Sequence, residues 1–252
     1  MAQKYYVVWQ GRETGIFTDW ATCKKHIDHF AGARYKSFKT LGEAEAAFKG
    51  NTKAGSSPKR SSPVKKNSLK TYTGGEISAM KVEVKIFTDG GCEPNPGKAG
   101  SGLAVYRNDL VDELWYGLYN PKGTNNTAEL NALFQALVMA KDECNRGNTV
   151  AIFCDSKYSI QCVTQWAIGW QKKGWKKSGG EIKNLELIKA MFALHQELKS
   201  EVQILHVNGH VGVEGNELAD RMSILAIESR ETEFTRFQEE VDIEVILATR
   251  AG

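Results

Sequence analysis

The chain has 252 residues, of which 41% are hydrophobic and 25% are charged, and its formal net charge is +3. This length and composition allow one or two soluble domains with a real core. No run of 18 apolar residues occurs, so we expect no membrane span. The five cysteines are scattered without a CxxC pair, which argues against a disulfide framework or a zinc site and favours reduced thiols in a cytoplasmic protein.

The charge is distributed unevenly along the chain. Residues 1–49 carry +3, residues 50–81 carry +6 and residues 82–252 carry −6. A basic front half on an acidic back half indicates a portion that binds a polyanion, joined to one that uses its carboxylates.

The first part of the chain, residues 1–49, is predicted to be a small α/β domain. The pattern predicts strands at residues 4–9, 15–17 and 33–38. It predicts helices at residues 18–30 and 40–49. Nine of the 24 aromatic residues lie before residue 50 and alternate with basic residues. Such a surface can stack on nucleic acid and neutralise it, although a compact core with a solvated basic rim explains the composition almost as well.

A Lys-, Ser-, Gly- and Pro-rich stretch, residues 50–81, is predicted to be a flexible basic linker. Residues 82–228 then show three hairpin-like strands followed by alternating helices and strands, which predicts a mixed α/β sheet with helices on both faces. The acidic stretch 229–252 is set apart as a tail to which the sequence assigns no role.

Four carboxylates stand out in residues 82–228. Asp89 and Asp155 each come after a strand that contains an apolar Ile-Phe pair, and each should end its strand. Glu129 is expected in the first turn of a helix that begins at Asn126, and Asp220 is expected one turn into the last helix. Parallel neighbouring strands would project both aspartates from one edge, although an Asp beside Gly is also a common turn former. Four crowded carboxylates repel one another, and all-oxygen ligands suit Mg²⁺ or Mn²⁺ rather than Zn²⁺.

The first domain resembles the hybrid-binding domain at the N-terminus of many type I ribonucleases H. The resemblance rests on aromatics before Gly-Arg, Gly-Ile-Phe before a Trp, and Gly-Ala-Arg-Tyr-Lys-Ser-Phe. It implies binding of an RNA–DNA hybrid, with double-stranded RNA as a second expected ligand, and backbone amides near Arg12 and Arg34 would meet RNA 2′-hydroxyls. The side chains implied to contact the duplex are Tyr6, Trp20, Tyr35 and Lys36.

Residues 82–228 resemble type I ribonuclease H along their whole length. The motifs, in order, are FTDGGCEPNPGKAGSG, TNNTAELNAL, FCDSKYSIQCVTQW, WQKKGWKK and VNGHVGVEGNELADRM. The resemblance implies a mixed five-stranded sheet with helices on both faces. It also implies that Asp89, Glu129, Asp155 and Asp220 bind two Mg²⁺, and that His210 on a mobile loop assists proton transfer or product release.

The same resemblance implies how the substrate is held. Asn95, Asn126 and the backbone of Cys92 match positions that detect 2′-hydroxyls, and Lys157 stands where family members usually have Gln. Thr124 and Asn125 match a pocket for a DNA phosphate. We expect Trp166 to belong to the core. The residues that match a basic handle for the DNA strand are Trp170, Lys172, Lys173, Trp175 and Lys176.

The sequence therefore predicts a monomeric endonuclease that cuts the RNA strand of RNA–DNA hybrids and leaves 5′-phosphate and 3′-hydroxyl ends. A polynucleotidyl transferase of the same fold, such as an integrase, is one alternative; Asn95, Asn126 and the basic handle argue against it. A catalytically silent hybrid-binding or duplex-RNA-binding protein is the other, and the four intact carboxylates argue against it.

Overall fold

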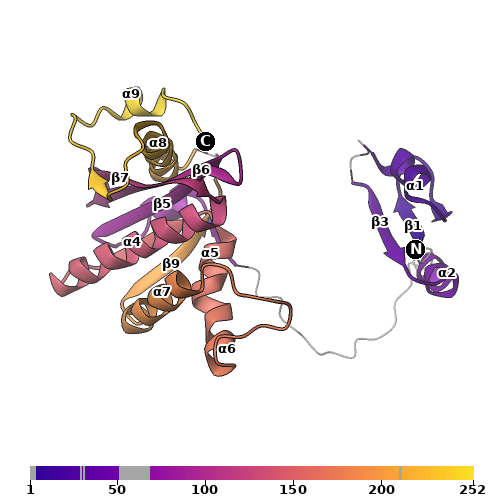
Figure 1. The fold of residues 1–252 in the computed structure, drawn as a ribbon. Coiled ribbons are helices and arrows are strands. Elements are labelled where there is room, and N and C mark those ends of the chain that lie inside the picture. The colour runs from indigo at the N-terminus through magenta and orange to yellow at the C-terminus, as the bar shows by residue number, and fades with distance from the viewer. Residues whose placement is uncertain (1–3, 29, 31, 51–68, 210–211) are drawn as a thin grey trace. The chain divides into compact units, whose positions relative to one another are not determined.

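A computed structural model describes residues 4–28, 30, 32–50, 69–209 and 212–252 (Figure 1). The chain divides into two compact units, residues 1–66 and 67–252, and each is described by itself. Within the described ranges no helix is both long and apolar enough to cross a bilayer.

The smaller unit is a three-stranded antiparallel sheet with two helices. Strand β1 (Tyr5–Gln10) lies between β2 (Gly15–Phe17) and β3 (Arg34–Phe38), and the helices are α1 (Trp20–Ile27) and α2 (Leu41–Gly50). Asp19 caps α1 by accepting a hydrogen bond from the backbone N–H of Thr22 at 2.8 Å. The predicted order of elements is therefore confirmed.

The larger unit is built on a mixed sheet in the order β10-β7-β6-β5-β8-β9-β4. Strands β5, β6 and β7 pair antiparallel, and β8, β9 and β4 continue from β5 in parallel. The five predicted strands form the centre, and two two-residue strands, β4 and β10, are added at the edges. The bounds are β4 (Thr71–Tyr72), β5 (Val84–Glu93), β6 (Gly97–Arg107), β7 (Leu110–Gly123), β8 (Val150–Cys154), β9 (Val202–Val207) and β10 (Thr235–Arg236).

Helices cover both faces of this sheet because its strands bury side chains on both sides. Ile86 packs against α4 and α7, whereas the next residue, Phe87, packs on the opposite face under α8. Figure 1 shows α8 and α9 on one side of the sheet and α4 and α7 on the other. The helices are α4 (Asn125–Asn145), α5 (Lys157–Gln161), the π-helical turn Cys162–Trp166, α6 (Ala167–Lys172), α7 (Leu185–Leu198), α8 (Glu214–Ser229) and α9 (Ile243–Leu247).

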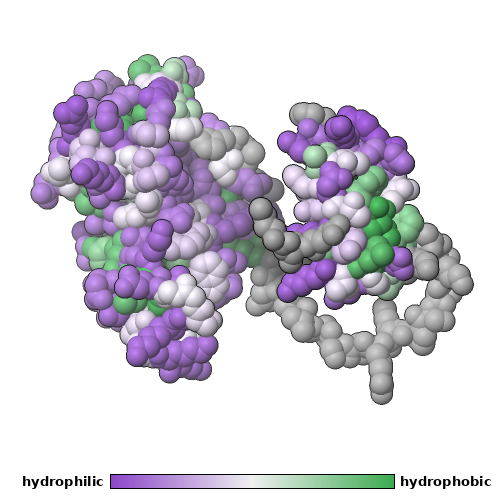
Figure 2. All heavy atoms as spheres, turned by 45° about the vertical axis from the view of Figure 1, so that its right-hand side comes forward, coloured by the Kyte–Doolittle hydropathy of each residue, from purple (hydrophilic) through white to green (hydrophobic). Residues whose placement is uncertain are grey.

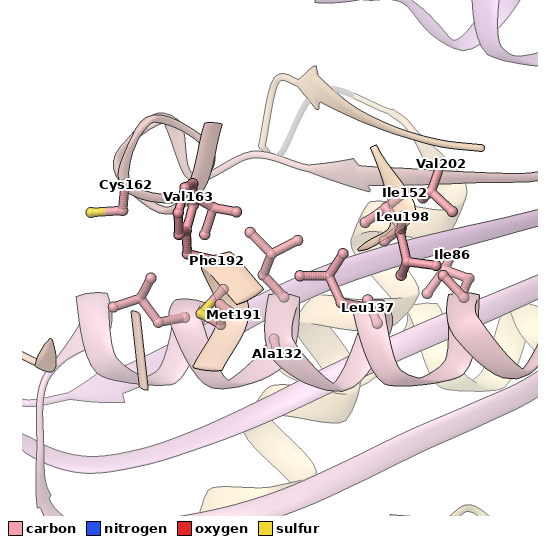
Figure 3. Packing of buried hydrophobic residues seen from close by; sticks show 14 of the residues in the cluster. Ile86, Ala132, Leu137, Ile152, Cys162, Val163, Met191, Phe192, Leu198 and Val202 are labelled. Atoms are coloured by element: carbon pink, nitrogen blue, oxygen red, sulfur yellow. The ribbon is translucent and has the colours of Figure 1, made fainter. Parts of the chain in front are cut away.

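The main core lies between the sheet and the α4–α7 layer. Figure 3 shows Leu137 of α4 on the side of the strand residues Ile86 and Ile152, and Ala132 of α4 near Met191 of α7, all within this core. Hydrophilic side chains cover most of the visible face of the larger unit, with hydrophobic ones scattered among them (Figure 2). The predicted α/β sheet with helices on both faces is thus confirmed.

The predicted linker is too long at its C-terminal end. Residues 51–68 lie outside the described residues, but Thr71–Tyr72 form β4 and Gly74–Ser78 form the helix α3. Ile77 of α3 is buried against the same core as Phe87. The Lys-, Ser- and Gly-rich composition of this segment did not predict β4 and α3. Both depend on tertiary contacts, namely the burial of Ile77 and the pairing of β4 with β9.

The acidic stretch 229–252 packs on the rest of the larger unit. Phe234 stacks on Trp115 with ring centroids 5.8 Å apart, and Phe237 donates its backbone N–H to Leu114 at 2.8 Å. Helix α9, capped by Asp242, buries Ile246 against α8. After α9 the chain runs to Gly252, whose backbone N–H bonds to Asp220 of α8.

Candidate active site

Asp89 and Asp155 come from neighbouring parallel strands. The last paired residues of β5 and β8 are Thr88 and Cys154, so the two aspartates follow at the same level. Asp155 directly follows β8, as predicted. Asp89 does not end its strand, because β5 continues to Glu93 while paired with β6, and the predicted turn after Asp89 is wrong.

Glycines let two helices approach the sheet closely enough to add the other two carboxylates. A Cβ atom at Gly90 would lie 2.2 Å from the backbone nitrogen of Glu129 in α4. On the opposite face, a Cβ atom at Gly102 would lie 2.2 Å from the carbonyl oxygen of Ala219, which precedes Asp220 in α8. Only a residue without a side chain fits at either strand position, so these glycines place Glu129 and Asp220 beside Asp89.

Both helices begin earlier than predicted. Thr124 caps α4 by accepting from the backbone N–H of Thr127 at 3.2 Å, so Glu129 lies in the second turn rather than the first. Helix α8 begins at Glu214, two residues earlier than predicted, so Asp220 lies about half a turn further into its helix. The predicted start of α4 missed the cap at Thr124, and α8 has no side-chain cap at Val213 that could have indicated its start.

All four carboxylates line one cavity of about 450 Å³. Asp89, Glu129 and Asp220 are buried and Asp155 is half-buried. Ligand atoms of Glu129, Cys154 and Asp155 lie within 4.8 Å of one another. The structure therefore gathers in one place the carboxylates that the sequence suggested as metal ligands.

Crowding and burial disfavour the charged forms of these groups. Burial, followed by the charges of Asp155 and Asp220, raises the pKa of Asp89 to about 8. Burial and the charges of Asp89 and Asp155 raise the pKa of Glu129 well above its usual range. Oε2 of Glu129 is buried without a hydrogen-bond partner among the described residues. A divalent cation would offset this repulsion and complete that oxygen's coordination.

One face of α8 holds the carboxylates in place. Ser223 donates to Oδ2 of Asp89 at 3.1 Å, Asn216 donates to Oδ2 of Asp155 at 3.2 Å, and Arg221 forms an ion pair with Asp220. The sequence reading missed these supports. Asn216, Asp220 and Ser223 are spaced i, i+4 and i+7, so the helical period that puts them on one face was the available signal.

The tail also reaches the cavity, which the sequence did not indicate. The backbone N–H of Gly252 donates to both carboxylate oxygens of Asp220, at 3.1 and 3.2 Å. Arg250 lines the cavity and forms an ion pair with Glu93. Arg250 and Gly252 therefore occupy part of the rim around the four carboxylates.

Comparisons with known proteins decide the family. A family model described as RNase H matches residues 81–228, and one described as the Ribonuclease H1 N-terminal domain matches residues 4–48. Ribonuclease H1 of Rattus norvegicus is 31% identical over 254 residues, which cover 87% of each chain. The chain belongs to the type I ribonuclease H family. The predicted family and enzyme class are thus confirmed.

Two further ribonucleases H show the same relationship within the catalytic unit. Ribonuclease H of Acidovorax sp. (strain JS42) is 38% identical over 147 residues, 58% of this chain and 95% of that protein. The crystal structure of LC9-RNase H1, a type 1 RNase H with the type 2 active-site motif, superposes with a TM-score of 0.52 at 23% identity. It covers 66% of this chain and 81% of the other, and it supports the ribonuclease H fold.

Two of the predicted RNA-strand and phosphate residues of this ribonuclease H lie at the carboxylate cavity. Cys92 and Asn125 line it, and the side chain of Asn95 accepts from the backbone N–H of Asn125 at 3.3 Å. Asn126 is exposed in the first turn of α4. Lys157 is exposed at the first position of α5.

The predicted basic handle lies on α6 and the turn after it. Lys172, Lys173 and Lys176 are exposed, whereas Trp175 packs edge-on against Phe192 with centroids 6.0 Å apart. Trp170 also packs against the core, and Trp166 is 37% exposed. The expectation that Trp166 is the core tryptophan of this group is wrong, because Trp166 is exposed whereas Trp170 and Trp175 pack against the core.

His210 and its neighbour in the loop lie outside the described residues. The loop leading to them passes close to the carboxylates, because a Cβ atom at Gly209 would lie 2.6 Å from Oδ2 of Asp155. The predicted role of His210 stays a prediction.

The smaller unit presents a row of aromatic rings. Trp20 lies between Tyr6 and Tyr35, with centroid distances of 5.4 and 5.8 Å, and Trp20 and Tyr35 are 44% and 47% exposed. Arg34 and Lys36 are also exposed on β3, but they flank Tyr35 in the strand and therefore alternate with it across the sheet. The exposed rings are of the kind that the sequence reading suggested for a nucleic-acid duplex.

Arg12 is bonded to the end of α1. Its backbone N–H donates to the carbonyl of His26 at 2.8 Å, and its guanidinium donates to the carbonyls of Lys25 and Asp28 at 2.9 and 2.6 Å. The predicted contact between backbone amides near Arg12 and RNA 2′-hydroxyls stays a prediction.

Proposed function

We propose that this ribonuclease H hydrolyses the RNA strand of RNA–DNA hybrids as an endonuclease. It uses two divalent cations and leaves 5′-phosphate and 3′-hydroxyl ends. The observation that carries this proposal is the cluster of four carboxylates around one 450 Å³ cavity, with the pKa of Asp89 raised to about 8. Such crowding is expected where cations are to be bound.

The residues fit Mg²⁺, with Mn²⁺ as the alternative. Asp89, Glu129, Asp155 and Asp220 would hold the ions through oxygen atoms, the ligands that both cations prefer. Burial raises the pKa of the neighbouring Cys154 thiol well above its usual range, so this sulfur stays protonated and is a poor ligand. The donor set thus favours hard cations over Zn²⁺.

The chain's own residues orient the reacting groups. When bound, the cations supply an activated water and stabilise the leaving oxygen. Ser223 and Asn216 hold the carboxylates of Asp89 and Asp155 from one face of α8, so these oxygens stay directed into the cavity. His210, in the loop that follows β9, would move protons or assist product release.

Substrate selection would come from the residues around the cavity. Cys92, Asn95 and Asn126 would read RNA 2′-hydroxyls, while Thr124 and Asn125 would hold a DNA phosphate. The exposed lysines of the handle would track the DNA strand. The aromatic row of the smaller unit would bind the duplex, hybrid above all and double-stranded RNA as a second ligand, and raise its local concentration.

The chemistry of the products tests this proposal. A hybrid with labelled RNA should yield fragments that an RNA ligase can rejoin without kinase or phosphatase treatment, because joining needs a 5′-phosphate and a 3′-hydroxyl. The reaction should require Mg²⁺ or Mn²⁺. Fragments bearing 3′-phosphate or cyclic phosphate ends, or cleavage that survives a chelator, would contradict the metal-assisted mechanism.

A further inference from the structure

The segment that leads into the catalytic unit is fixed to the sheet edge beside the active site. We name residues 70–80 the edge segment. Its strand β4 runs parallel to β9, with Thr71 opposite His206 and Tyr72 opposite Val207. Lys70 and Glu76 form an ion pair at 2.9 Å, and α3 begins with a capping box between Thr73 and Glu76. The edge segment is therefore an ordered part of the catalytic unit.

His206 connects this segment to Asp155. Its ring is buried, with 3% exposed, and its two nitrogens have different neighbours. Nδ1 lies 2.8 Å from the hydroxyl oxygen of Thr71, and Nε2 lies 3.2 Å from the backbone carbonyl oxygen of Asp155. The imidazole of His206 thus connects Thr71 of β4, at the edge of the sheet, with the backbone of Asp155, a predicted metal ligand.

The chemistry of these partners fixes the donor nitrogen of the ring. A carbonyl oxygen only accepts, so Nε2 must carry a proton to bond to it. A hydroxyl can donate to an unprotonated Nδ1 or accept from a protonated one, so Thr71 can bond to the other nitrogen in either case. The carbonyl of Asp155 therefore fixes Nε2 as the donor, and Thr71 holds the opposite side of the ring.

The carbonyl of Asp155 lies just beyond the strand ladder. The last pair between β8 and β9 is Cys154 with His206, so Asp155 follows the final ladder position. The His206 ring supplies a donor at that point, while Asn216 holds the carboxylate of the same residue from α8. The backbone and the side chain of Asp155 are thus fixed from two elements.

We infer that His206 is a positioning residue for the metal-binding carboxylate of Asp155, and that Thr71 of the edge segment holds the His206 ring in place through its hydroxyl group. This inference rests on the proposed function, in which Asp155 binds a metal ion. It makes the edge segment a working part of the active site. Partners that orient a metal ligand typically change metal affinity or activity by about 10–100-fold when they are removed outright.

Thr71→Val in the full chain removes the hydroxyl group with almost no change in volume. Because one neutral hydrogen bond is lost and His206 remains, calorimetric titration with Mn²⁺ should show about fivefold weaker binding. The kcat on hybrid should fall by a similar factor while KM stays constant. In ¹⁵N spectra, the Nδ1 resonance of His206 should shift as the ring loses its hydroxyl partner. Thr71→Ser, which keeps the hydroxyl, should restore all three readouts.

Thr73→Val is the matched control, because it makes the same chemical change two residues away. It removes the cap of α3 and should lower the melting temperature, but it leaves the His206 resonances and Mn²⁺ affinity unchanged. If Thr71→Val leaves the Nδ1 resonance, the metal affinity and kcat unchanged, the inference is wrong. Equal losses in both variants would show general loosening and overturn it as well.

Failure of the proposed function has a different signature. A wild-type chain that binds no Mn²⁺ and cleaves no hybrid would refute the role of Asp155 as a ligand, and the inference would fall with it. A wild-type chain that binds and cleaves normally, together with a Thr71→Val variant that does the same, would refute the positioning role alone.

Discussion

The close approach of α4 to β5 at Gly90 should control both stability and catalysis. In Gly90→Ala the new Cβ atom would lie 2.2 Å from the nitrogen of Glu129 and 2.3 Å from the carbonyl carbon of Ala128. Both are backbone atoms of a long helix, so an ordinary contact requires α4 to move by roughly 1 Å. Overpacking of this kind costs about 1–3 kcal/mol. Misplacing a catalytic group by roughly 1 Å can cost on the order of 10²-fold in rate.

Denaturant unfolding of the catalytic unit and kcat on a labelled hybrid measure these two effects. Gly169→Ala is the control, because this glycine sits inside α6 and nothing lies within 4 Å of the place that the new methyl group would take. Replacing a helical glycine there should stabilise the chain by about 0.5–1 kcal/mol and leave turnover unchanged. A Gly90→Ala enzyme with wild-type stability and turnover would refute the claim that this contact places Glu129.

Asp89→Asn or Asp155→Asn should abolish cleavage while hybrid binding, measured by anisotropy, survives, because binding rests on phosphate and sugar contacts; near-normal turnover would contradict this. His210→Ala should slow saturated turnover by about 10²-fold with little change in affinity, and an unchanged rate would make the residue structural. Without metal, Asp89 keeps its proton up to about pH 8 in the folded chain, whereas the unfolded chain releases this proton near pH 3.8. The free energy of unfolding should therefore fall as the pH rises from about 3.8 to about 8. Mg²⁺ should remove this fall in melting scans, and a flat metal-free profile would contradict the pKa. A chain that begins at residue 69 should still cleave, with higher KM and a flatter salt dependence, whereas one that begins at Val82 loses β4 and α3 and should melt earlier; equal melting would contradict the role of that segment.

The sequence predicted the elements whose signals are local. The Ile-Phe-Thr-Asp and Ile-Phe-Cys-Asp runs placed Asp89 and Asp155 after the apolar residues of two core strands, because apolar strand periodicity and a following carboxylate can be read without tertiary information. That the two strands are parallel neighbours was a condition of the prediction, and the structure shows that it is met. The turn expected after Asp89 was wrong for a tertiary reason. Gly90 and the residues after it stay extended because they pair with β6, and α4 packs on the glycine rather than the chain turning there.

Contacts between distant segments could not be predicted in the same way. Thr71 and His206 are 135 residues apart, and Gly252 and Asp220 are brought together only by the path of the tail over α8. Neither polar composition nor periodicity indicates such pairings, since each depends on packing that forms with the whole sheet. The i, i+4, i+7 spacing of Asn216, Asp220 and Ser223 is the exception, because a helical face can be read from sequence.

A cleavage assay on three labelled duplexes tests the central claim most directly. The same RNA sequence is presented in an RNA–DNA hybrid and in duplex RNA, with duplex DNA as the third substrate, each with Mg²⁺ and with a chelator. Metal-dependent cutting within the RNA strand of the hybrid, with duplex DNA intact and duplex RNA bound but cut far more slowly, is the predicted result. Equal cleavage of all three duplexes, or cleavage of hybrid in the presence of the chelator, would contradict the account.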